Sequence, residues 1–393
     1  MPLLNRAVEM QDDVSGWRRH LHENPELMFD VHGTAQFVAE KLRQFGCDDV
    51  QTGIGRTGVV GVIHGSHGEG QTIGLRADMD ALPLTETTGR PWASRTAGKM
   101  HACGHDGHTA MLLGAARYLA ETRNFKGSVA VIFQPAEEGG GGGREMVKDG
   151  IMENFSISEV YGMHNIPGLP IGQFAIRKGP IMAATDEFTI TIEGQGGHAA
   201  QPHRTVDPVV VGAQLVNTLQ TIVSRGTDPL DSVVLSVTKF HAGDAHNVIP
   251  QRAELAGTVR TLRPEMRDFA QKRLIEVAEG VAGALGASAN VHYVRNYPVT
   301  FNHSRETDFA ANTARHVAGN SAVDEAVAPM MAGEDFSYML ESRPGAFIFI
   351  GNGDSASLHS PSYDFNDDAI PHGISYWVQL AEAALCHLPS DCR

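Results

Sequence analysis

The alternation of helical and strand-like apolar patterns constrains the fold of this chain more than any other feature of its sequence. Val14, Trp17 and Leu21 recur with helical spacing, and short apolar runs elsewhere before residue 135 indicate buried strands. In chain order we expect a helix ending near Pro25, a helix from about Thr34, strands at 59–63 and 72–75, a helix at about 109–122 and a strand at 128–133. Buried strands separated by helices are typical of an α/β fold with a mostly parallel sheet.

The pattern changes near Ala183 and changes back after Pro298. Between these points the expected order is strand, helix, strand, strand, helix and strand, at 186–193, 208–224, 232–240, 253–262, 264–285 and 288–296. This βαββαβ order is the ferredoxin-like unit, a small α+β domain. A helix at about 305–316, a strand at 346–350 and a helix at about 372–387 resume the first pattern. We therefore expect an α/β domain (1–182 and 298–393) interrupted by an inserted domain (183–297).

The charge and the cysteine content exclude several classes of protein. Lys and Arg number 31 against 46 Asp and Glu, a net charge of −15, which repels nucleic acids and anionic membranes, so neither is expected as a partner. The sequence shows no apolar run long enough for a secretory signal or a transmembrane segment. Four cysteines, Cys47, Cys103, Cys386 and Cys392, are too few for a disulfide scaffold, so we expect reduced thiols and a cytoplasmic location.

The segment MHACGHDGH at 100–108 suits a transition-metal site. Cys103 and His105 stand two residues apart just before an expected helix, whose N-terminal dipole favours a thiolate. Gly104 and Gly107 allow the tight bending that brings neighbouring side chains to one point. A thiolate beside imidazoles suits zinc, cobalt, nickel or manganese rather than magnesium or calcium. The segment alone leaves open a buried structural cysteine beside histidines that cap a helix.

Two adjacent glutamates, Glu137 and Glu138, follow the apolar run at 128–133. In an open α/β sheet, ligands bind beyond the carboxyl ends of strands, which is where this pair is expected. One carboxylate can then bind a metal while the other takes a proton from water. The alternative is a solvated acidic turn, although the flanking Pro135 and the glycines at 139–143 favour close approach to a ligand.

Two further histidines extend the set of candidate ligands. His164 follows a short strand-like run, and His359 lies in a loop after the strand expected at 346–350. A lone histidine of this kind is more often a hydrogen-bonded structural residue than a ligand. Five groups, however, each lie at the end of an expected α/β element and could together bind two metals: Cys103, His105, Glu138, His164 and His359.

Eight motifs follow one another along the chain: RADMDALP (76–83), MHACGHDGH (100–108), FQPAEEG (133–139), GMHN (162–165), GQGGHAAQPH (194–203), NVIP (247–250), AGEDFS (332–337) and LHSPSYDFND (358–367). In this order they resemble the M20-type metallopeptidases, specifically the amidohydrolase branch that includes hippurate hydrolases, N-acyl-amino-acid amidohydrolases and plant auxin-conjugate hydrolases. The resemblance runs from about His20 to the final helix and implies the same two-domain architecture.

The resemblance implies a two-metal centre whose ligands are Cys103, His105, Glu138, His164 and His359. It also implies that Glu137 is the general base. Where the wider superfamily has a His-x-Asp motif, this chain has Asp78-Met79-Asp80, so Asp80 fits the role of an orienting carboxylate. The histidine of that motif is absent, the histidine of the CGH motif compensates for it, and the role of Asp78 stays open.

In the inserted domain, the resemblance gives His198 the role of stabilising the oxyanion, often in the active site of a dimer partner. The residues alone favour a histidine in a turn beside glycines. Arg260 could bind a substrate carboxylate or form a surface salt bridge, and Asn247 could donate its amide to a carbonyl or carboxylate of the substrate. We therefore expect the inserted domain to serve as a lid and to form a homodimer or homotetramer.

The expected function is that of a metal-dependent amidohydrolase that cleaves the amide bond of a small N-acyl amino acid, using two divalent ions of zinc, manganese, cobalt or nickel. A dipeptidase or carboxypeptidase of the same family is one alternative. A cysteine hydrolase with Cys103 as nucleophile is another, and a non-catalytic sensor of metal or acyl-amino acid is a third. An intact Glu137 beside a full ligand set disfavours the sensor, since a binding protein needs no base.

Overall fold

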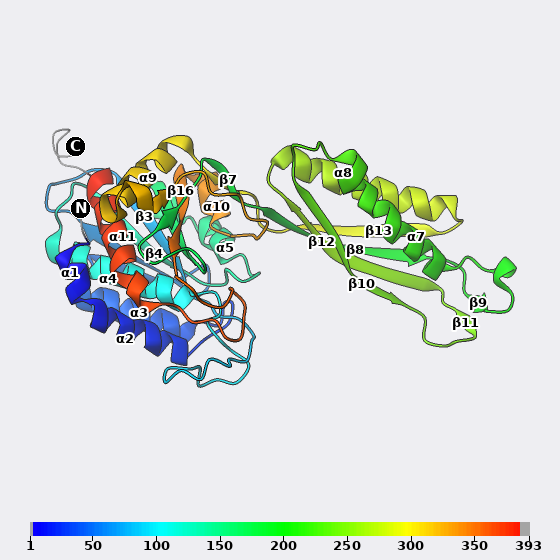
Figure 1. The fold of residues 1–393 in the computed structure, drawn as a ribbon, viewed down its shortest axis with the longest axis horizontal. Coiled ribbons are helices and arrows are strands. Elements are labelled where there is room, and N and C mark those ends of the chain that lie inside the picture. The colour runs from blue at the N-terminus through cyan, green and yellow to red at the C-terminus, as the bar shows by residue number, and fades with distance from the viewer. Residues whose placement is uncertain (1–2, 386–393) are drawn as a thin grey trace. The chain divides into compact units, whose positions relative to one another are not determined.

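The structure is a computed structural model that describes residues 3–385. The chain forms two compact units (Figure 1). The first contains the residues up to Ile181, Phe301–Ala328 and the residues from Asp335 onward, and the second contains Met182–Thr300 and Pro329–Glu334. Cys386, Cys392 and the end of the helix expected at 372–387 lie outside the described residues.

Among the described residues, the first unit is built on an eight-stranded sheet in the order β1-β2-β4-β3-β5-β16-β6-β15. Its strands are β1 (Asp49–Ile54), β2 (Gly58–His64), β3 (Thr72–Asp78), β4 (Ser128–Gln134), β5 (Ile157–Ile166), β6 (Phe174–Ala175), β15 (Val323–Asp324) and β16 (Gly345–Gly351). β4, β3, β5 and β16 are parallel at the centre, whereas β1 and β2 add an antiparallel edge. The predicted α/β fold is confirmed, with a mixed sheet that is parallel at its centre.

Helix α4 is the central helix of the first unit. The helices described there are α1 (Asn5–Glu9), α2 (Gln11–Glu23), α3 (His32–Phe45), α4 (His105–Thr122), α5 (Gly142–Lys148), α6 (Ile151–Asn154), α9 (Ser304–Ala318), α10 (Ser337–Ser342) and α11 (Ile370–Ala384). α4 packs on β3 and against α2, α3 and α11, and every residue from 105 to 116 is buried. His105, Asp106 and His108 therefore hold polar side chains inside the protein, in the first turn of α4. None of the helices in the described part of the chain has the length and apolar character needed to cross a membrane.

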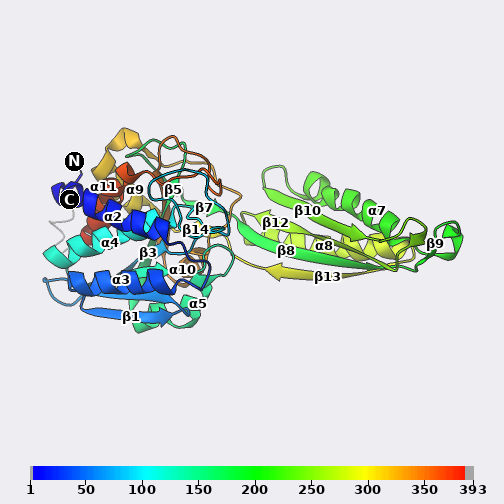
Figure 2. The same cartoon turned by 90° about the horizontal axis from the view of Figure 1, so that it is seen from below.

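The second unit, all of whose residues are described, has a four-stranded antiparallel sheet in the order β10-β12-β8-β13 (Figure 2). Its main elements are β8 (Ala184–Glu193), α7 (Pro208–Thr221), β10 (Val233–Ala242), β12 (Arg252–Thr261), α8 (Pro264–Ala284) and β13 (Ser288–Arg295). This is the ferredoxin-like order expected from the sequence. Phe188, Ile190 and Ile192 alternate along β8 and are buried in a separate apolar core beneath α7 and α8.

The short strands and one peripheral segment were less evident in the sequence. β7 (Gly179–Met182) pairs with β14 (Thr300–Asn302), and β9 (Gly197–His198) pairs with β11 (Val248–Ile249). The second unit also includes Pro329–Glu334, which the apolar pattern assigned to the other domain. This segment contacts the start of the second unit, where the Ala183 N–H donates to the Ala332 carbonyl at 2.8 Å. Periodicity carries no signal for so short a backbone pairing.

The carboxyl ends of the central parallel strands meet at one edge of the sheet. β3 ends in Asp78, β4 ends in Gln134, and His164 lies near the end of β5. The loop that follows β16 carries His359. Because parallel strands end at the same edge, the fold brings these distant parts of the sequence together.

Candidate metal centre

Cys103 and His105 flank the glycine at which α4 begins. Gly104 has a left-handed backbone (φ +89°), and a Cβ there would lie 2.2 Å from Asn165 Nδ2 and 2.5 Å from the Tyr363 hydroxyl. Only glycine fits this close approach. The turn places the Cys103 sulfur and a nitrogen of His105 within 4.8 Å of each other. Helix α4 begins at His105, four residues before the start at residue 109 that the apolar pattern predicted.

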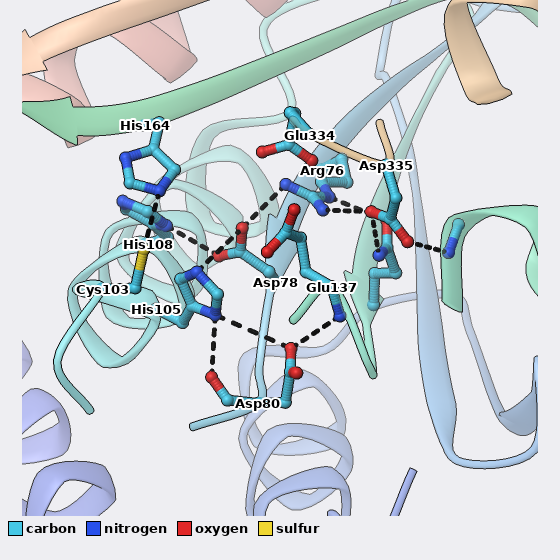
Figure 3. A network of polar contacts seen from close by, with 12 residues as sticks. Arg76, Asp78, Asp80, Cys103, His105, His108, Glu137, His164, Glu334 and Asp335 are labelled. Carbon is cyan, nitrogen blue, oxygen red and sulfur yellow. Dashed lines mark hydrogen bonds and ion pairs between the residues drawn. The ribbon is translucent and has the colours of Figure 1, made fainter. Parts of the chain in front are cut away.

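The five predicted metal ligands lie around the Cys103 sulfur. The ligand atoms of Cys103, His105 and His164 lie within 4.8 Å of one another, and so do those of Cys103, Glu138 and His359. The Cys103 Sγ is 3.4 Å from His164 Nε2 (Figure 3). His359 Nε2 is 3.2 Å from Glu138 Oε1. The structure thus brings together all five residues, in two groups of three donors that share the sulfur.

Hydrogen bonds set which nitrogen of each buried histidine is available to a metal. His105 Nδ1 lies 2.8 Å from the Asp80 carbonyl, and His164 Nδ1 lies 2.7 Å from the Asn165 carbonyl. A carbonyl can only accept, so each Nδ1 carries a proton, and in the neutral ring the lone pair is on Nε2. His105 Nε2 is buried and has no hydrogen-bond partner among the described residues. A metal ion would satisfy this otherwise unpaired nitrogen.

Burial and neighbouring charges set the protonation of the donors. Burial raises the pKa of the Cys103 thiol and holds the pKa of His164 well below its ordinary value. Burial also opposes the charged form of His105, but Asp78 and Cys103 outweigh it and raise the pKa of that imidazole. A buried thiolate needs a cation beside it, while a neutral imidazole offers a lone pair. This donor set fits divalent transition metals such as zinc, manganese, cobalt or nickel.

The two glutamates lie in a turn that the Asp80 carboxylate holds. The Glu137 N–H donates to Asp80 Oδ1 at 2.9 Å, and the Glu138 N–H donates to Asp80 Oδ2 at 3.1 Å. The preceding Ala136 has a positive φ of 54°, a strained backbone that such anchoring maintains. One carboxylate oxygen of each glutamate lies within 4.8 Å of a His105 nitrogen. Asp80 therefore orients both glutamates with its side chain and His105 with its carbonyl.

The centre is buried on one side and reaches solvent on the other. His105 is fully buried and Glu137 is 7% exposed, whereas the His359 side chain is 56% exposed. The His359 N–H donates to the Ala102 carbonyl at 2.8 Å, which ties the 359 loop to the segment before Cys103. His359 also has a positive φ of 63°. A substrate would therefore approach the centre from the side of Glu138 and His359.

Comparisons with known proteins agree with this geometry. Residues 74–383 match the family described as Peptidase family M20/M25/M40. The chain is 41% identical over 381 residues to the hippurate hydrolase of Campylobacter jejuni, covering 97% of this chain and 99% of that protein. It is 42% identical over 377 residues to the N-acetyl-L-cysteine deacetylase of Bacillus subtilis, covering 96% of this chain and 89% of that one. The chain belongs to peptidase family M20/M25/M40.

A solved structure from the same family is also similar over nearly the whole chain. It is the Bacillus subtilis YXEP protein, described as a dinuclear metal binding peptidase from the M20 family, with a TM-score of 0.84, 34% identity and coverage of 96% of this chain and 99% of that one. The prediction of a dinuclear M20 enzyme from the amidohydrolase branch is thereby confirmed. An enzyme of this class needs no cysteine nucleophile, so the cysteine hydrolase and the sensor are set aside.

His108 and Asp78 belong to the hydrogen-bond network beneath the metal centre of this M20 enzyme. His108 Nδ1 donates to Asp78 Oδ1 at 2.7 Å, and His108 Nε2 accepts from the Asn165 N–H at 2.9 Å and from Asn165 Nδ2 at 3.0 Å. Both nitrogens of His108 are thus engaged, and neither is available to a metal. Arg76 donates to Asp78 Oδ2 at 2.8 Å. The geometry therefore gives Asp78, whose role the sequence left open, a supporting position (Figure 3).

Sequence reasoning missed Arg76, His108 and Asn165 as parts of the site. All three lie within motifs that carry the family resemblance, RADMDALP, MHACGHDGH and GMHN. Their place in the motifs was the available signal. Their roles depend on partners distant in sequence, such as the pair formed by Asn165 and His108.

The residues predicted in the inserted domain separate into two places within the second unit. His198 pairs with Val248 between β9 and β11, and the Ala199 N–H donates to the Asn247 carbonyl at 3.0 Å. Arg260 lies near the opposite end of β12, eight residues beyond the first residue of that strand, Arg252. At about 3.3 Å per residue this separates Arg260 from the β9–β11 end by roughly 25 Å. The structure brings His198 and Asn247 together and leaves Arg260 apart from them.

Proposed function

We propose that the enzyme hydrolyses the amide bond of small N-acyl amino acids, releasing a carboxylate and a free amino acid. The observation that carries this proposal is a buried carboxylate, Glu137, placed beside two overlapping groups of metal donors. The names of the two relatives support the substrate class, since hippurate and N-acetyl-L-cysteine are both N-acyl amino acids.

We assign the bond changes to residues of this chain. Cys103, His105, Glu138, His164 and His359 would hold two divalent metals, which would polarise the scissile carbonyl and make the attacking water more acidic. Glu137 takes a proton from that water as the new C–O bond forms, and passes it to the amine nitrogen as the C–N bond breaks. Asp80 keeps Glu137 in place through the backbone N–H. No net proton is needed from solvent during these two transfers.

Residues of the second unit would complete the site around the substrate. His198 would donate to the developing oxyanion, Asn247 to a substrate carbonyl or carboxylate, and Arg260 to the substrate carboxylate. Because roughly 25 Å of strand separates Arg260 from His198 and Asn247, one chain cannot place all three on one small substrate. This separation supports a site shared between two chains, in a homodimer or a homotetramer.

A substrate screen tests the proposal. The enzyme is stripped with a chelator, restored separately with zinc, manganese, cobalt or nickel, and assayed with N-benzoylglycine, N-acetylcysteine and other N-acyl amino acids. We expect no activity in the stripped enzyme and metal-dependent release of free amino acid after restoration. Undiminished activity after complete metal removal, or no hydrolysis of any N-acyl amino acid with any metal, contradicts the proposal.

Peptide hydrolysis is the second candidate, because the similar B. subtilis structure is described as a peptidase. Dipeptides with a free amino terminus belong in the same screen. A kcat/KM for dipeptides above that for all N-acyl amino acids favours a dipeptidase or carboxypeptidase. The reverse order favours the amidohydrolase.

A further inference from the structure

The loop that carries the two glutamates is fixed at both of its ends by one buried carboxylate. This catalytic loop, residues 134–143, begins at the end of β4 and ends in the first turn of α5. Gln134 Nε2 donates to Asp335 Oδ1 at 2.6 Å. At the other end, the Gly143 N–H donates to Asp335 Oδ2 at 2.8 Å. Asp80 holds the middle of the same loop, so two carboxylates anchor it at three points.

Arg76 links one of these anchors, Asp335, to the start of the catalytic loop and to Asp78 (Figure 3). Its Nε donates to Gln134 Oε1 at 2.9 Å, and its Nη2 donates to Asp335 Oδ1 at 3.0 Å. Arg76, Gln134 and Asp335 therefore form a closed triangle in which every pair is hydrogen bonded. Arg76 also donates to Asp78, the acceptor of the His108 proton. The triangle thus connects the catalytic loop to the base of the metal centre.

The packing leaves little freedom for this arrangement to shift. Arg76, Gln134 and Asp335 are all essentially buried. A Cβ on Gly143 would lie 2.7 Å from the Asp335 carbonyl oxygen, so the backbones meet directly at this point. One carboxylate oxygen of Asp335 lies within 4.8 Å of one of Glu137. A small displacement of Asp335 would therefore change the position of Glu137.

Stability alone does not account for a buried carboxylate here. Removing an ion from water is costly, and buried ion pairs can often be replaced by apolar residues without loss of stability. Asp335 Oδ1 accepts from Gln134 and Arg76, and Asp335 Oδ2 accepts from the Gly143 N–H. Their two loop partners are the residues that begin and end the glutamate-bearing segment. These hydrogen bonds thus fix the positions of the two ends of that segment.

We propose that Asp335 is a positioning residue that sets the location of the Glu137 carboxylate by fixing both ends of the catalytic loop. The inference rests on the proposed function, because it presupposes that Glu137 moves the proton during amide hydrolysis. Asp335 acts through Glu137 and touches no reacting atom. Its loss should therefore lower kcat while leaving substrate binding and metal content in place.

The first test is Asp335→Asn in the metal-loaded, full-length enzyme. The amide keeps one oxygen for Arg76 and Gln134 but turns an N–H₂ group toward the Gly143 N–H, which removes that anchor. A displacement of about 1 Å in a reacting group costs on the order of 10²-fold in rate, so we expect kcat to fall by roughly 10- to 100-fold with KM and metal content within about twofold. Unchanged kcat overturns the proposal, and so does a loss of rate that is matched by loss of metal.

The second test asks whether Asp335 acts through Glu137. The rate of the Glu137→Gln variant is measured with and without Asp335→Asn, at high enzyme concentration. If Asp335 only positions Glu137, the second substitution should change the already reduced rate by less than about twofold, since coupled residues are not additive. The same 10- to 100-fold loss in both backgrounds overturns the proposal.

Glu26→Gln is the matched control. The Glu26 carboxylate also accepts two backbone N–H bonds in the first unit, from Gly33 at 3.1 Å and Thr34 at 2.8 Å, but these fix the start of α3 rather than the catalytic loop. The Glu26→Gln substitution should lower the melting temperature of the enzyme without changing its kcat. If Glu26→Gln lowers kcat as much as Asp335→Asn does at equal loss of stability, the effect is not one of loop position and the proposal is overturned.

Gln134→Met gives a second route should Asp335→Asn fail to fold. It removes the anchor at the start of the loop and leaves the Gly143 bond intact, so we expect a smaller loss of kcat, about 3- to 10-fold, with metal retained. Wild-type kcat in this variant overturns the proposal. The wild-type enzyme is assayed alongside. If the wild type does not hydrolyse N-acyl amino acids, the proposed function is rejected. If the wild type and the variant are both fully active, only the role of Asp335 is rejected.

Discussion

Glu137 and Glu138 carry the same side chain at adjacent positions, but their surroundings differ. Glu137 is 7% exposed, whereas the Glu138 carboxylate lies 3.2 Å from His359 and belongs to the donor group around Cys103. We expect Glu137→Gln to keep its metal and lose about 10²- to 10⁴-fold in kcat, because an amide cannot accept the proton of the water. Glu138→Gln should instead lose bound metal together with activity. Measuring bound metal and kcat for each variant checks both expectations. If Glu137→Gln loses metal and Glu138→Gln keeps it, the two roles are interchanged.

The proposed role of Cys103 as a metal donor leads to a separate prediction. Cys103→Ser should lower bound metal and activity together, because a hydroxyl is a poor substitute for a thiolate that two donor groups share. His164→Ala should do the same, since it removes the Nε2 atom that lies 3.4 Å from the sulfur. Cys47, the other free cysteine in the described part of the chain, provides the control. Full metal occupancy in Cys103→Ser, or an equal loss in Cys47→Ser, contradicts the assignment.

At the scale of single residues, the sequence predicted the proposed metal ligands better than it predicted the residues that hold those ligands in place. Each proposed ligand lies in a loop or helix start at the end of a strand, a location that patterning and motifs can identify. The supporting residues differ, because their function is defined by partners across the fold. Asp335 is an example, since nothing in AGEDFS indicates that its carboxylate accepts from both Gln134 and Gly143. The same holds for His108, whose two nitrogens could be assigned only once Asp78 and Asn165 were in place.

At the scale of elements, predictions succeeded where one face of an element is buried in apolar contacts. β4 and β16 are buried almost throughout, and the expected runs at 128–133 and 346–350 lie within them. β1 gave no such signal because it is an edge strand whose residues are mostly exposed. The start of α4 was missed because its first turn is polar and its N-cap is a left-handed glycine. Apolar periodicity indicates which residues are buried against other apolar side chains. It therefore cannot identify an exposed edge strand such as β1 or a polar first turn such as that of α4.

A buried ion pair joins two of these elements and makes stability depend on pH. His22 Nδ1 in α2 lies 2.8 Å from Asp106 Oδ2 in α4. Burial opposes the charged imidazole, but Asp106 outweighs it and raises the pKa of His22 from 6.5 to about 9. The folded-state pKa exceeds the unfolded one, so the pair contributes its full stability below pH 6.5 and loses it as the pH rises through about 9.

We therefore expect the unfolding free energy of the wild type to fall between pH 6.5 and about 9. The loss should exceed that of His22→Gln by on the order of 2 to 3 kcal/mol. Denaturant unfolding of the metal-loaded protein across this range measures the difference. His20→Gln, on the exposed face of the same helix, is the control and should keep the wild-type dependence on pH. An equally steep loss in His22→Gln contradicts the proposed source of the effect.

At the scale of the whole molecule, the two compact units differ in the spacing of their apolar residues, and each has an apolar core of its own. The inserted βαββαβ unit buries its alternating strands under α7 and α8, independently of the core around α4. Two edge strands, β10 and β13, bound its sheet. Exposed strand edges are commonly covered by pairing with another chain. What one chain's sequence could not specify is which chain's metal centre His198 serves.

Mixing two inactive variants decides that question. Glu137→Gln lacks the proposed base, and His198→Ala lacks the proposed oxyanion donor, whose loss should cost about 10²- to 10³-fold in kcat. If His198 serves the partner's site, a mixed dimer has one site lacking both groups and one site with both intact. Random exchange makes half of the dimers mixed, so activity should return to roughly a quarter of wild type. If His198 serves its own chain, every site in a mixed dimer lacks one group and activity stays near that of the separate variants. Native mass spectrometry of differently tagged chains establishes that exchange has occurred, and exchange without recovery of activity rejects the shared site.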